Sequence, residues 1–313
     1  MRLARIFLVL ACCTLSAWPA AAWGLEGHRV IALIAQRTLE QNDKPVWAKV
    51  AALLAEDSSN SWTKTDIASE ATWADVLLEK SEEARTATMA WHYVRFNPAR
   101  PDLHRDCFGR RALPTGLPAS HGPQDDCVVN KIEQFERELI DPSTSQKERL
   151  MALRFLLNLV GDVHEPLYAI DRGDQGGACT ALAIGQDATP VRLLTYWDET
   201  LVAQAIGKDP DKGAAELAAA ATPAEAKKWA AGAADDWARE SFELAKSVAY
   251  AFRADRTAGK YTFPAAKGSK DRCGAVALSR ADADYRAKAL ATVKAQLVKA
   301  GLRLALVLRD GLQ

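Results

Sequence analysis

The chain has 313 residues, of which 49% are hydrophobic and 26% are charged, with 40 basic and 40 acidic side chains. This composition is typical of a soluble globular protein with a sizeable core, and it excludes an intrinsically disordered chain and a fibrous rod. Because the net charge is near zero, it also excludes a histone-like protein that holds a polyanion over its whole surface. Any anionic substrate must therefore be bound at a local site.

The N-terminus has the pattern of an export signal, with two arginines, a short apolar run and three alanines that end at Ala22. The apolar run is too short to span a bilayer. We expect a signal peptide over residues 1–22, a mature chain over 23–313 without a membrane anchor, and a secreted or periplasmic location. A lipid anchor at Cys12 or Cys13 is the alternative.

Four cysteines remain in the expected mature chain: Cys107, Cys127, Cys179 and Cys273. An even number in an exported chain predicts two disulfides, and the sequence does not choose among the three possible pairings. A zinc site built from cysteines is disfavoured, because the mature chain has no pair with CxxC spacing.

The first predicted elements are helices. Apolar residues recur at helical spacing over 27–39 and again over 46–54, directly after Pro45. Residues 97–126 are rich in Pro, Gly, Arg and Asp and contain Cys107, which predicts a long loop held by a disulfide.

The second half of the chain predicts further helices around one irregular segment. Residues 146–163 form a helix that is apolar almost all round and therefore central, and Pro166 ends it. Residues 169–193 contain several glycines and predict an irregular segment with room for a short hairpin. A capping box followed by proline starts a helix expected over 222–252, and the last helix is expected over 281–308. Without internal repeats or linkers, this pattern predicts a single, mainly helical (all-α) domain.

Three places near the predicted helices hold residues suited to metal binding. His28 lies five residues after Trp23, whose free amine and carbonyl could chelate a metal, although a tryptophan could stand at this terminus by chance. Asp75 and His92 each stand beside aromatic residues that are expected to be buried, and burial of such polar groups requires compensation. A satisfied core histidine is the plainer interpretation of His92 taken alone.

Asn158 and Asp162 are four residues apart on the central helix, so both project from one face and could reach one point. An arginine or a terminal amine is the alternative partner for Asp162. His164 should point elsewhere, about 200° around the helix axis, and serve a structural role. His104 and His121 lie in the long loop and are expected to be solvated.

Several motifs stand in the same order as in the S1/P1 nuclease family: Trp23-Gly24-x-x-Gly27-His28, Trp73-Ala74-Asp75, Trp91-His92-Tyr93, Gly161-Asp162-Val163-His164-Glu165-Pro166-Leu167, Gly176-Gly177, Trp197-Asp198 and Ala300-Gly301-Leu302-Arg303-Leu304-Ala305. The chain therefore resembles this family over essentially its whole expected mature length. The resemblance implies a mainly helical fold with three zinc ions at the bottom of a cleft. It also implies hydrolysis of phosphodiester bonds in single-stranded nucleic acid, which leaves 5′-phosphates, and often release of phosphate from 3′-nucleotides.

The resemblance assigns zinc ligands residue by residue. One Zn²⁺ would be bound by the Trp23 amine and carbonyl, His28 and Asp162. Its neighbour would be bound by Asp75, His92 and Asp162, and Asp75 would also orient the attacking water. Asn158 stands where the family has a histidine, and it is a weaker zinc ligand.

The third zinc site departs from the family pattern. The matching positions hold Tyr168, Leu194 and Asp198, and only Asp198 is a ligand of the expected type. Leu78 replaces the arginine that binds phosphate in the family. We therefore expect one or two Zn²⁺ ions, a doubtful role for Asp198, and reduced activity.

Three functions remain open at this stage. The first is a metal-dependent hydrolase, most simply a monomer, that acts on single-stranded nucleic acid or nucleotides. The second is a catalytically silent binding protein with a nuclease-like cleft and one or two metals. The third, related to phospholipase C, acts on lipid headgroups and is disfavoured because the chain ends carry no apolar helix for membrane docking.

Overall fold

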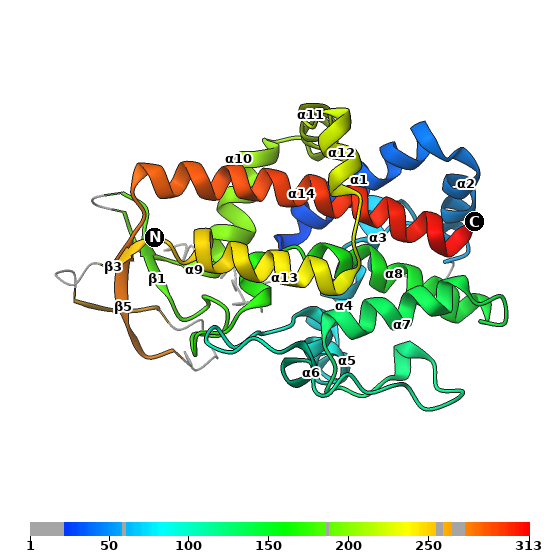
Figure 1. The fold of residues 1–313 in the computed structure, drawn as a ribbon, viewed down its shortest axis with the longest axis horizontal. Helices are drawn as coiled ribbons and strands as arrows, with labels where there is room; N and C mark the ends of the chain where they lie inside the picture. The colour runs from blue at the N-terminus through cyan, green and yellow to red at the C-terminus, as the bar shows by residue number, and fades with distance from the viewer. Residues whose placement is uncertain (1–21, 58–60, 186–187, 255–258, 265–272) are drawn as a thin grey trace, which may run out of the picture.

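In the computed structural model, which describes residues 22–57, 61–185, 188–254, 259–264 and 273–313, long helices form the body of the molecule (Figure 1). Helix α1 (Gly24–Asn42) packs along the C-terminal helix α14 (Ala283–Leu312). Helices α7 (Val128–Ile140) and α8 (Gln146–Asp162) form a second pair, which α14 also contacts. The residues expected to form a signal peptide lie outside the described part, apart from Ala22.

Helix α8 lies at the centre, as its apolar sequence predicts. From Ala152 to Asp162 every residue of this helix is buried. Its neighbours are α1, α4 (Trp73–Lys80), α7 and α14, so several segments distant in sequence meet at its C-terminal end. One continuous cluster of buried apolar side chains joins these helices. This supports a single, mainly helical domain.

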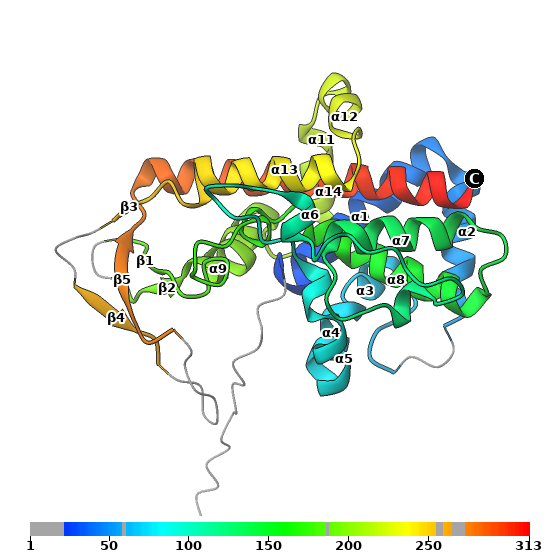
Figure 2. The same ribbon diagram turned by 60° about the horizontal axis from the view of Figure 1, so that its bottom comes forward.

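The shorter helices fill the connections between the long ones. They are α2 (Lys44–Ala55), α3 (Ile67–Glu70), α5 (Glu82–Thr88), η1 (Met89–His92), α6 (Leu103–Asp106), η2 (Ala119–His121), η3 (Pro166–Ala169), α9 (Leu193–Thr195), η4 (Tyr196–Leu201), α10 (Val202–Ile206), α11 (Pro210–Ala220), α12 (Pro223–Trp229), α13 (Ala234–Leu244) and η5 (Ala245–Ala249). Helices α11 and α12 protrude from the body (Figure 2).

A small sheet lies at one end of the molecule (Figures 1 and 2). It contains β1 (Ala181–Ala183), β2 (Val191–Arg192), β3 (Arg253–Ala254), β4 (Lys260–Thr262) and β5 (Ala275–Arg280). The strand order is β2-β1-β5-β3, and β4 also pairs with β5. The β1–β5 pair is parallel, and the other pairs formed by these strands are antiparallel. The β1–β2 pair confirms the expected hairpin.

Two disulfides hold the irregular segments to the body. Cys107–Cys127 closes the long loop onto the start of α7, and Cys179–Cys273 joins the segment before β1 to the segment before β5. The expectation of two bridges is confirmed, and the structure supplies the pairing.

The single helix expected over 222–252 is wrong, because the chain breaks between α12 and α13. Gly232 takes φ 89°, a left-handed conformation that a helix interior does not allow. The Asp236 carboxylate then accepts a hydrogen bond from the Ala233 N–H and caps the new helix. The other predicted helices are found with ends shifted by a few residues, and α14 is longer than expected.

Candidate metal centre

The residues proposed from the sequence come from five separate elements and are all buried. Trp23 precedes α1 and His28 lies in its first turns, Asp75 begins α4, His92 ends η1, Asn158 and Asp162 lie in the last turns of α8, and Asp198 lies in η4. None of these residues is more than 8% exposed. Their burial in one protein interior requires that they compensate one another's charge.

Asp162 lies between the two imidazoles. Its Oδ2 accepts a hydrogen bond from His92 Nδ1 at 2.7 Å, and its Oδ1 lies 3.3 Å from His28 Nε2. The same His28 nitrogen lies 3.5 Å from Asp75 Oδ2. Two histidines and two aspartates that are far apart in sequence thus meet at the end of α8.

Asn158 joins this group through Asp75. Its amide nitrogen donates to Asp75 Oδ2 at 2.9 Å and to the Ala71 carbonyl at 3.1 Å. The structure therefore brings Asn158 and Asp162 to one point, as their spacing predicts. The Asn158 carbonyl oxygen is buried and makes no hydrogen bond with the described residues.

Trp23 contacts both α8 and η4. Its indole N–H donates to the Gly161 carbonyl at 2.9 Å, and its backbone N–H donates to Asp198 Oδ1 at 3.3 Å. The backbones of Gly24 and Asp198 can approach each other closely because Gly24 has no side chain. A Cβ at Gly24 would lie 3.1 Å from the Asp198 carbonyl oxygen. Asp198 thus contacts the Trp23 amide. Leu194, the residue that replaces a histidine of the third zinc site, is apolar and 8% exposed.

The absence of a side chain at Gly161 leaves room for the His28 ring against helix α8. A Cβ built on Gly161 would lie 2.7 Å from His28 Nδ1 and 2.9 Å from Cε1, both too close for a real side chain. The imidazole therefore packs directly on the helix backbone, one residue before Asp162.

The pKa values of His28, His92 and Asp162 are shifted by their burial and by one another's charges. Burial opposes ionisation of His28 and His92, but the neighbouring Asp75 and Asp162 carboxylates outweigh it and raise both pKa values. Burial also opposes ionisation of Asp162, yet His92 and His28 hold its pKa below the ordinary value. The carboxylates thus favour the protonated imidazoles, and the imidazoles favour the ionised Asp162.

A second acidic group lies nearby. Burial raises the pKa of Glu165 to about 8, and burial followed by the Glu165 charge raises that of Asp198 well above the ordinary range. Burial and then the Asp198 charge raise the pKa of the Tyr168 phenol, which therefore stays protonated at neutral pH. Glu165 is a site residue that the sequence does not identify, beyond its place between Asp162 and Pro166 in a family motif.

Several donor atoms of the site lack hydrogen bonds. Within the described residues, these buried atoms are His28 Nδ1 and Nε2, His92 Nε2, Asn158 Oδ1, Asp162 Oδ1 and Asp198 Oδ2. No set of three or more His, Cys, Asp and Glu side chains in this part of the chain stands ready around a metal ion. The donors instead contact one another.

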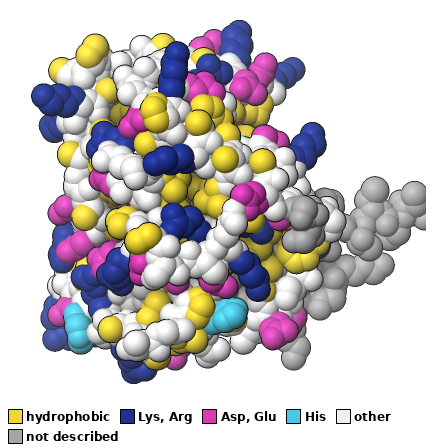
Figure 3. Space-filling view, turned by 90° about the vertical axis from the view of Figure 1, so that its right-hand side faces the viewer, with side chains coloured by type: hydrophobic (Ala, Val, Ile, Leu, Met, Phe, Trp, Pro, Cys, Tyr) yellow, Lys and Arg dark blue, Asp and Glu magenta, His cyan; other side chains and the backbone are white. Residues whose placement is uncertain are grey.

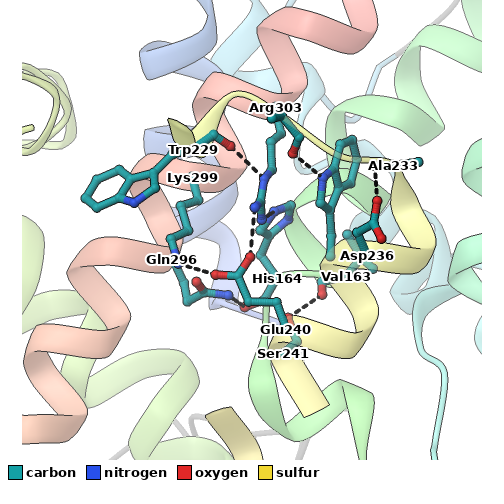
Figure 4. A network of polar contacts seen from close by, with 12 residues as sticks. Val163, His164, Trp229, Ala233, Asp236, Glu240, Ser241, Gln296, Lys299 and Arg303 are labelled. Carbon is teal, nitrogen blue, oxygen red and sulfur yellow. Dashed lines mark hydrogen bonds and ion pairs between the residues drawn. The ribbon is translucent and has the colours of Figure 1, made fainter. Parts of the chain in front are cut away.

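The turn after α8 is held from behind by helices α13 and α14 (Figure 4). Gln296 donates to the His164 carbonyl at 3.1 Å, and Ser241 donates to the Val163 carbonyl at 2.7 Å. Arg303 donates from Nη1 to His164 Nε2 at 2.9 Å. Because a guanidinium only donates, Nε2 carries no proton and Nδ1–H donates to the Val160 carbonyl at 2.6 Å.

Charges around Arg303 complete this network. Its Nη2 donates to Glu240 at 2.7 Å and its Nε donates to the Trp229 carbonyl at 2.8 Å, while Lys299 pairs with the same glutamate (Figure 4). Burial and then the Arg303 charge hold the pKa of His164 well below its ordinary value. His164 therefore points away from Asp162 and is structural, as expected. No local pattern in the sequence identifies Arg303 as its partner.

The surface offers no broad basic band on the face shown in Figure 3, where basic and acidic side chains are interspersed around apolar patches.

His104 and His121 are exposed, as expected for residues of the long loop. None of the helices formed by the described residues combines the length and apolarity that a membrane crossing requires.

Comparison with known proteins gives a consistent result. The model of the S1/P1 Nuclease family matches residues 23–313. Nuclease S1 of Aspergillus oryzae (strain ATCC 42149 / RIB 40) is 26% identical over 190 residues, which are 59% of this chain and 56% of that protein. Endonuclease 4 of Arabidopsis thaliana is 26% identical over 194 residues, or 60% and 58%.

Nuclease P1 of Penicillium citrinum is 29% identical over 149 residues, which are 47% of each chain. The chain therefore spans about half to three fifths of the length of these relatives in the matched regions.

Proposed function

Because the chain belongs to the S1/P1 nuclease family, we propose that it is a metal-dependent nuclease that hydrolyses phosphodiester bonds in single-stranded nucleic acid or nucleotides. The observation that carries this proposal is the buried group of Asp75, His92, Asp162 and His28 at the end of α8. The names of the similar proteins, which are nucleases, support it.

The donor set fits one or two Zn²⁺ ions. Imidazole nitrogens and carboxylate oxygens are ordinary zinc ligands, and the site holds buried donor atoms without hydrogen bonds. Trp23, His28 and Asp162 would hold one ion, and Asp75, His92, Asp162 and the weaker Asn158 would hold its neighbour. When bound, zinc supplies an acidified water and positive charge toward the phosphate.

The protein's own contribution is to orient and charge-balance these groups. Asn158 fixes one Asp75 oxygen through its amide, and this contact orients the carboxylate that we assign to position the attacking water. His92 fixes one Asp162 oxygen and leaves the other without a hydrogen bond. The surrounding apolar helices exclude bulk water, which strengthens every charge interaction in the site.

The third position does not fit a zinc ion, so we propose reduced activity. A leucine cannot bind zinc, and the protonated Tyr168 phenol is a poor ligand. Asp198 stays a doubtful ligand, because it accepts a hydrogen bond from the Trp23 amide. Loss of one charge-stabilising group commonly costs about 10² to 10³ in rate.

We further propose that the protein is exported after cleavage behind Ala22 and acts as a secreted or periplasmic monomer without a membrane anchor. The two disulfides support an oxidising location. Cleavage at that bond would free the Trp23 amine, whose nitrogen already lies inside the site next to Asp198.

Metal content and activity measured together test the proposed function. We expect the purified protein to contain one or two zinc ions and to cleave single-stranded DNA slowly, with both properties lost in Asp162→Asn and His28→Ala. Asp235→Asn is the matched control, because Asp235 is a surface carboxylate paired with Arg239. A wild-type protein that binds zinc but leaves DNA and 3′-nucleotides intact would instead support the alternative, a catalytically silent binding protein, which the altered third position favours.

A restored variant tests the account of the missing groups. The combined changes Leu78→Arg, Tyr168→His and Leu194→His should add a zinc ion and raise the rate by at least about tenfold. A wild-type protein that already binds three zinc ions and cleaves as fast as this variant would contradict the account.

A further inference from the structure

The interior of the site is rich in carboxyl groups. Asp75, Asp162, Glu165 and Asp198 are buried around the end of α8, together with the imidazoles of His28 and His92. Leu78, on the same helix as Asp75, is apolar and 5% exposed, so it offers no charge. A cation at the rim of the site would therefore add positive charge toward an anion beyond that of the proposed metal ions.

The arginines behind the site are already engaged. Arg303 is bound by Glu240, His164 and the Trp229 carbonyl. Arg85 donates to the Leu78 and Glu79 carbonyls and pairs with Glu82. Neither guanidinium is available to a substrate without the loss of these contacts.

Arg95 lies on the segment that leaves His92. This segment runs beside residues 168–169, because the Val94 N–H donates to the Tyr168 carbonyl at 3.1 Å and the Phe96 N–H donates to the Ala169 carbonyl at 3.2 Å. Val94 and Phe96 are each 1% exposed. Since side chains alternate along an extended segment, Tyr93 and Arg95 share the opposite, partly exposed side.

The Arg95 guanidinium stacks on an aromatic wall of the site. Its Cζ lies 4.0 Å from the centre of the Tyr93 ring, and that ring meets the Tyr168 ring edge to face at 6.5 Å. The Tyr168 N–H donates to Glu165 Oε2 at 2.9 Å, so this wall extends from Arg95 toward the buried carboxyl groups.

Stacking leaves the polar edge of Arg95 available. A guanidinium that lies on a ring face keeps its N–H donors in its own plane, where they match two oxygens of a phosphate. Within the described part of the chain, Arg95 has no hydrogen bond or ion pair with another residue. It is thus a cation that is held in place but not neutralised.

We propose that Arg95 binds a phosphate group of the single-stranded substrate at the rim of the metal centre, next to His92. This inference rests on the proposed nuclease function and deepens it. Arg95 supplies positive charge that Leu78 does not, from a different segment. Because the contact is made before reaction as well as during it, it acts on substrate affinity more than on the chemical step.

A binding experiment tests this inference. Fluorescence anisotropy measures how tightly the zinc-loaded protein binds a fluorescein-labelled phosphorothioate oligothymidylate at salt concentrations between 50 and 200 mM. Arg95→Met should weaken binding about tenfold. It should also reduce the slope of log affinity against log salt by about 0.7, the value for one phosphate contact on a single strand. Arg95→Lys keeps the charge and should keep most of the slope, which separates loss of charge from a folding defect.

Arg239→Met is the matched control, because it removes the same net charge at a surface residue that is paired with Asp235. It should leave affinity and slope unchanged. In hydrolysis of unmodified single-stranded DNA, Arg95→Met should raise KM about tenfold with kcat unchanged. Equal affinity and slope in wild type and Arg95→Met would overturn the inference alone, whereas a wild-type protein that binds but does not cleave would overturn only the proposed function.

Discussion

At the level of single residues, Asp162 and His164 occupy the same turn but face opposite sides of helix α8. Asp162 faces His28 and His92, while His164 faces Arg303 on α14. The contacts of His164 therefore fix the backbone from which the Asp162 carboxylate projects. If Asp162 binds zinc as proposed, loss of such partners should lower metal affinity by about 10- to 100-fold.

Arg303→Met should destabilise the protein by about 3 kcal/mol, because it leaves His164 Nε2 without its donor and one Glu240 oxygen without its cation. Arg303 is 7% exposed, so solvent does not replace these contacts. Arg309→Met, on the exposed side of the same helix, should change stability by less than about 0.5 kcal/mol. Urea unfolding of both variants measures the difference, and equal stabilities would contradict the role given to Arg303.

The sequence predicts the residues of the site better than their partners. The spacing of Asn158 and Asp162 indicates one helix face, and the structure brings both to Asp75 and His28. In contrast, Arg303 lies 139 residues from His164, and no local pattern links the two. The stacking of Arg95 on Tyr93 was also not predicted, because it depends on how residues 93–96 pair with 168–169.

At the level of elements, the contact between α7 and the end of α14 holds an unfavourable cluster of acidic side chains. Burial, then the charges of Glu133 and Asp310, raises the pKa of Glu136 to about 7. The folded protein therefore holds this proton more tightly than the unfolded chain does. The resulting stabilisation is present below about pH 4.5 and is lost as the pH rises to about 7.

Glu136→Gln should consequently stabilise the protein above pH 7 by up to about 3 kcal/mol and have little effect near pH 4. Denaturant unfolding of wild type and variant from pH 4 to 8 gives the difference directly. Glu216→Gln, a change at an exposed residue of α11, serves as the control and should give a small difference that does not vary with pH in this way. A constant difference for Glu136→Gln would exclude the buried acidic contact as its cause.

Local sequence signals predict the long helices and the β1–β2 hairpin, but not the helix interruptions or the rest of the sheet. The capping box at Thr222 is present, yet the helix that it starts ends at Trp229, because Gly232 and the Asp236 cap begin a new one. The sheet beyond this hairpin is not predicted, because its strands are only two to six residues long. Its parallel β1–β5 pair joins segments about a hundred residues apart, which no local periodicity reveals.

At the level of the whole molecule, the two disulfides constrain the unfolded chain to different extents. Cys107–Cys127 spans 20 residues and Cys179–Cys273 spans 94. Loop-closure entropy gives about 3 kcal/mol for the shorter loop and about 5 kcal/mol for the longer one. The longer bridge also ties together the segments that lead into the parallel strands β1 and β5.

Replacement of both cysteines of a pair by serine should therefore cost more stability for Cys179 and Cys273 than for Cys107 and Cys127. Thermal and urea unfolding of the two double variants checks the order, with zinc content measured in parallel. A larger loss for the shorter bridge would show that native contacts of the long loop, rather than chain entropy, decide the effect.

Gly161 offers a way to disturb the centre by shape alone. An alanine there improves helix propensity and removes no polar group, yet its methyl occupies the volume that the His28 ring needs. Such a variant would keep every proposed metal ligand but displace the His28 imidazole. A related chain that carries any larger residue at this position must seat that imidazole differently, so a single small residue serves as a sequence marker for the geometry of the whole centre.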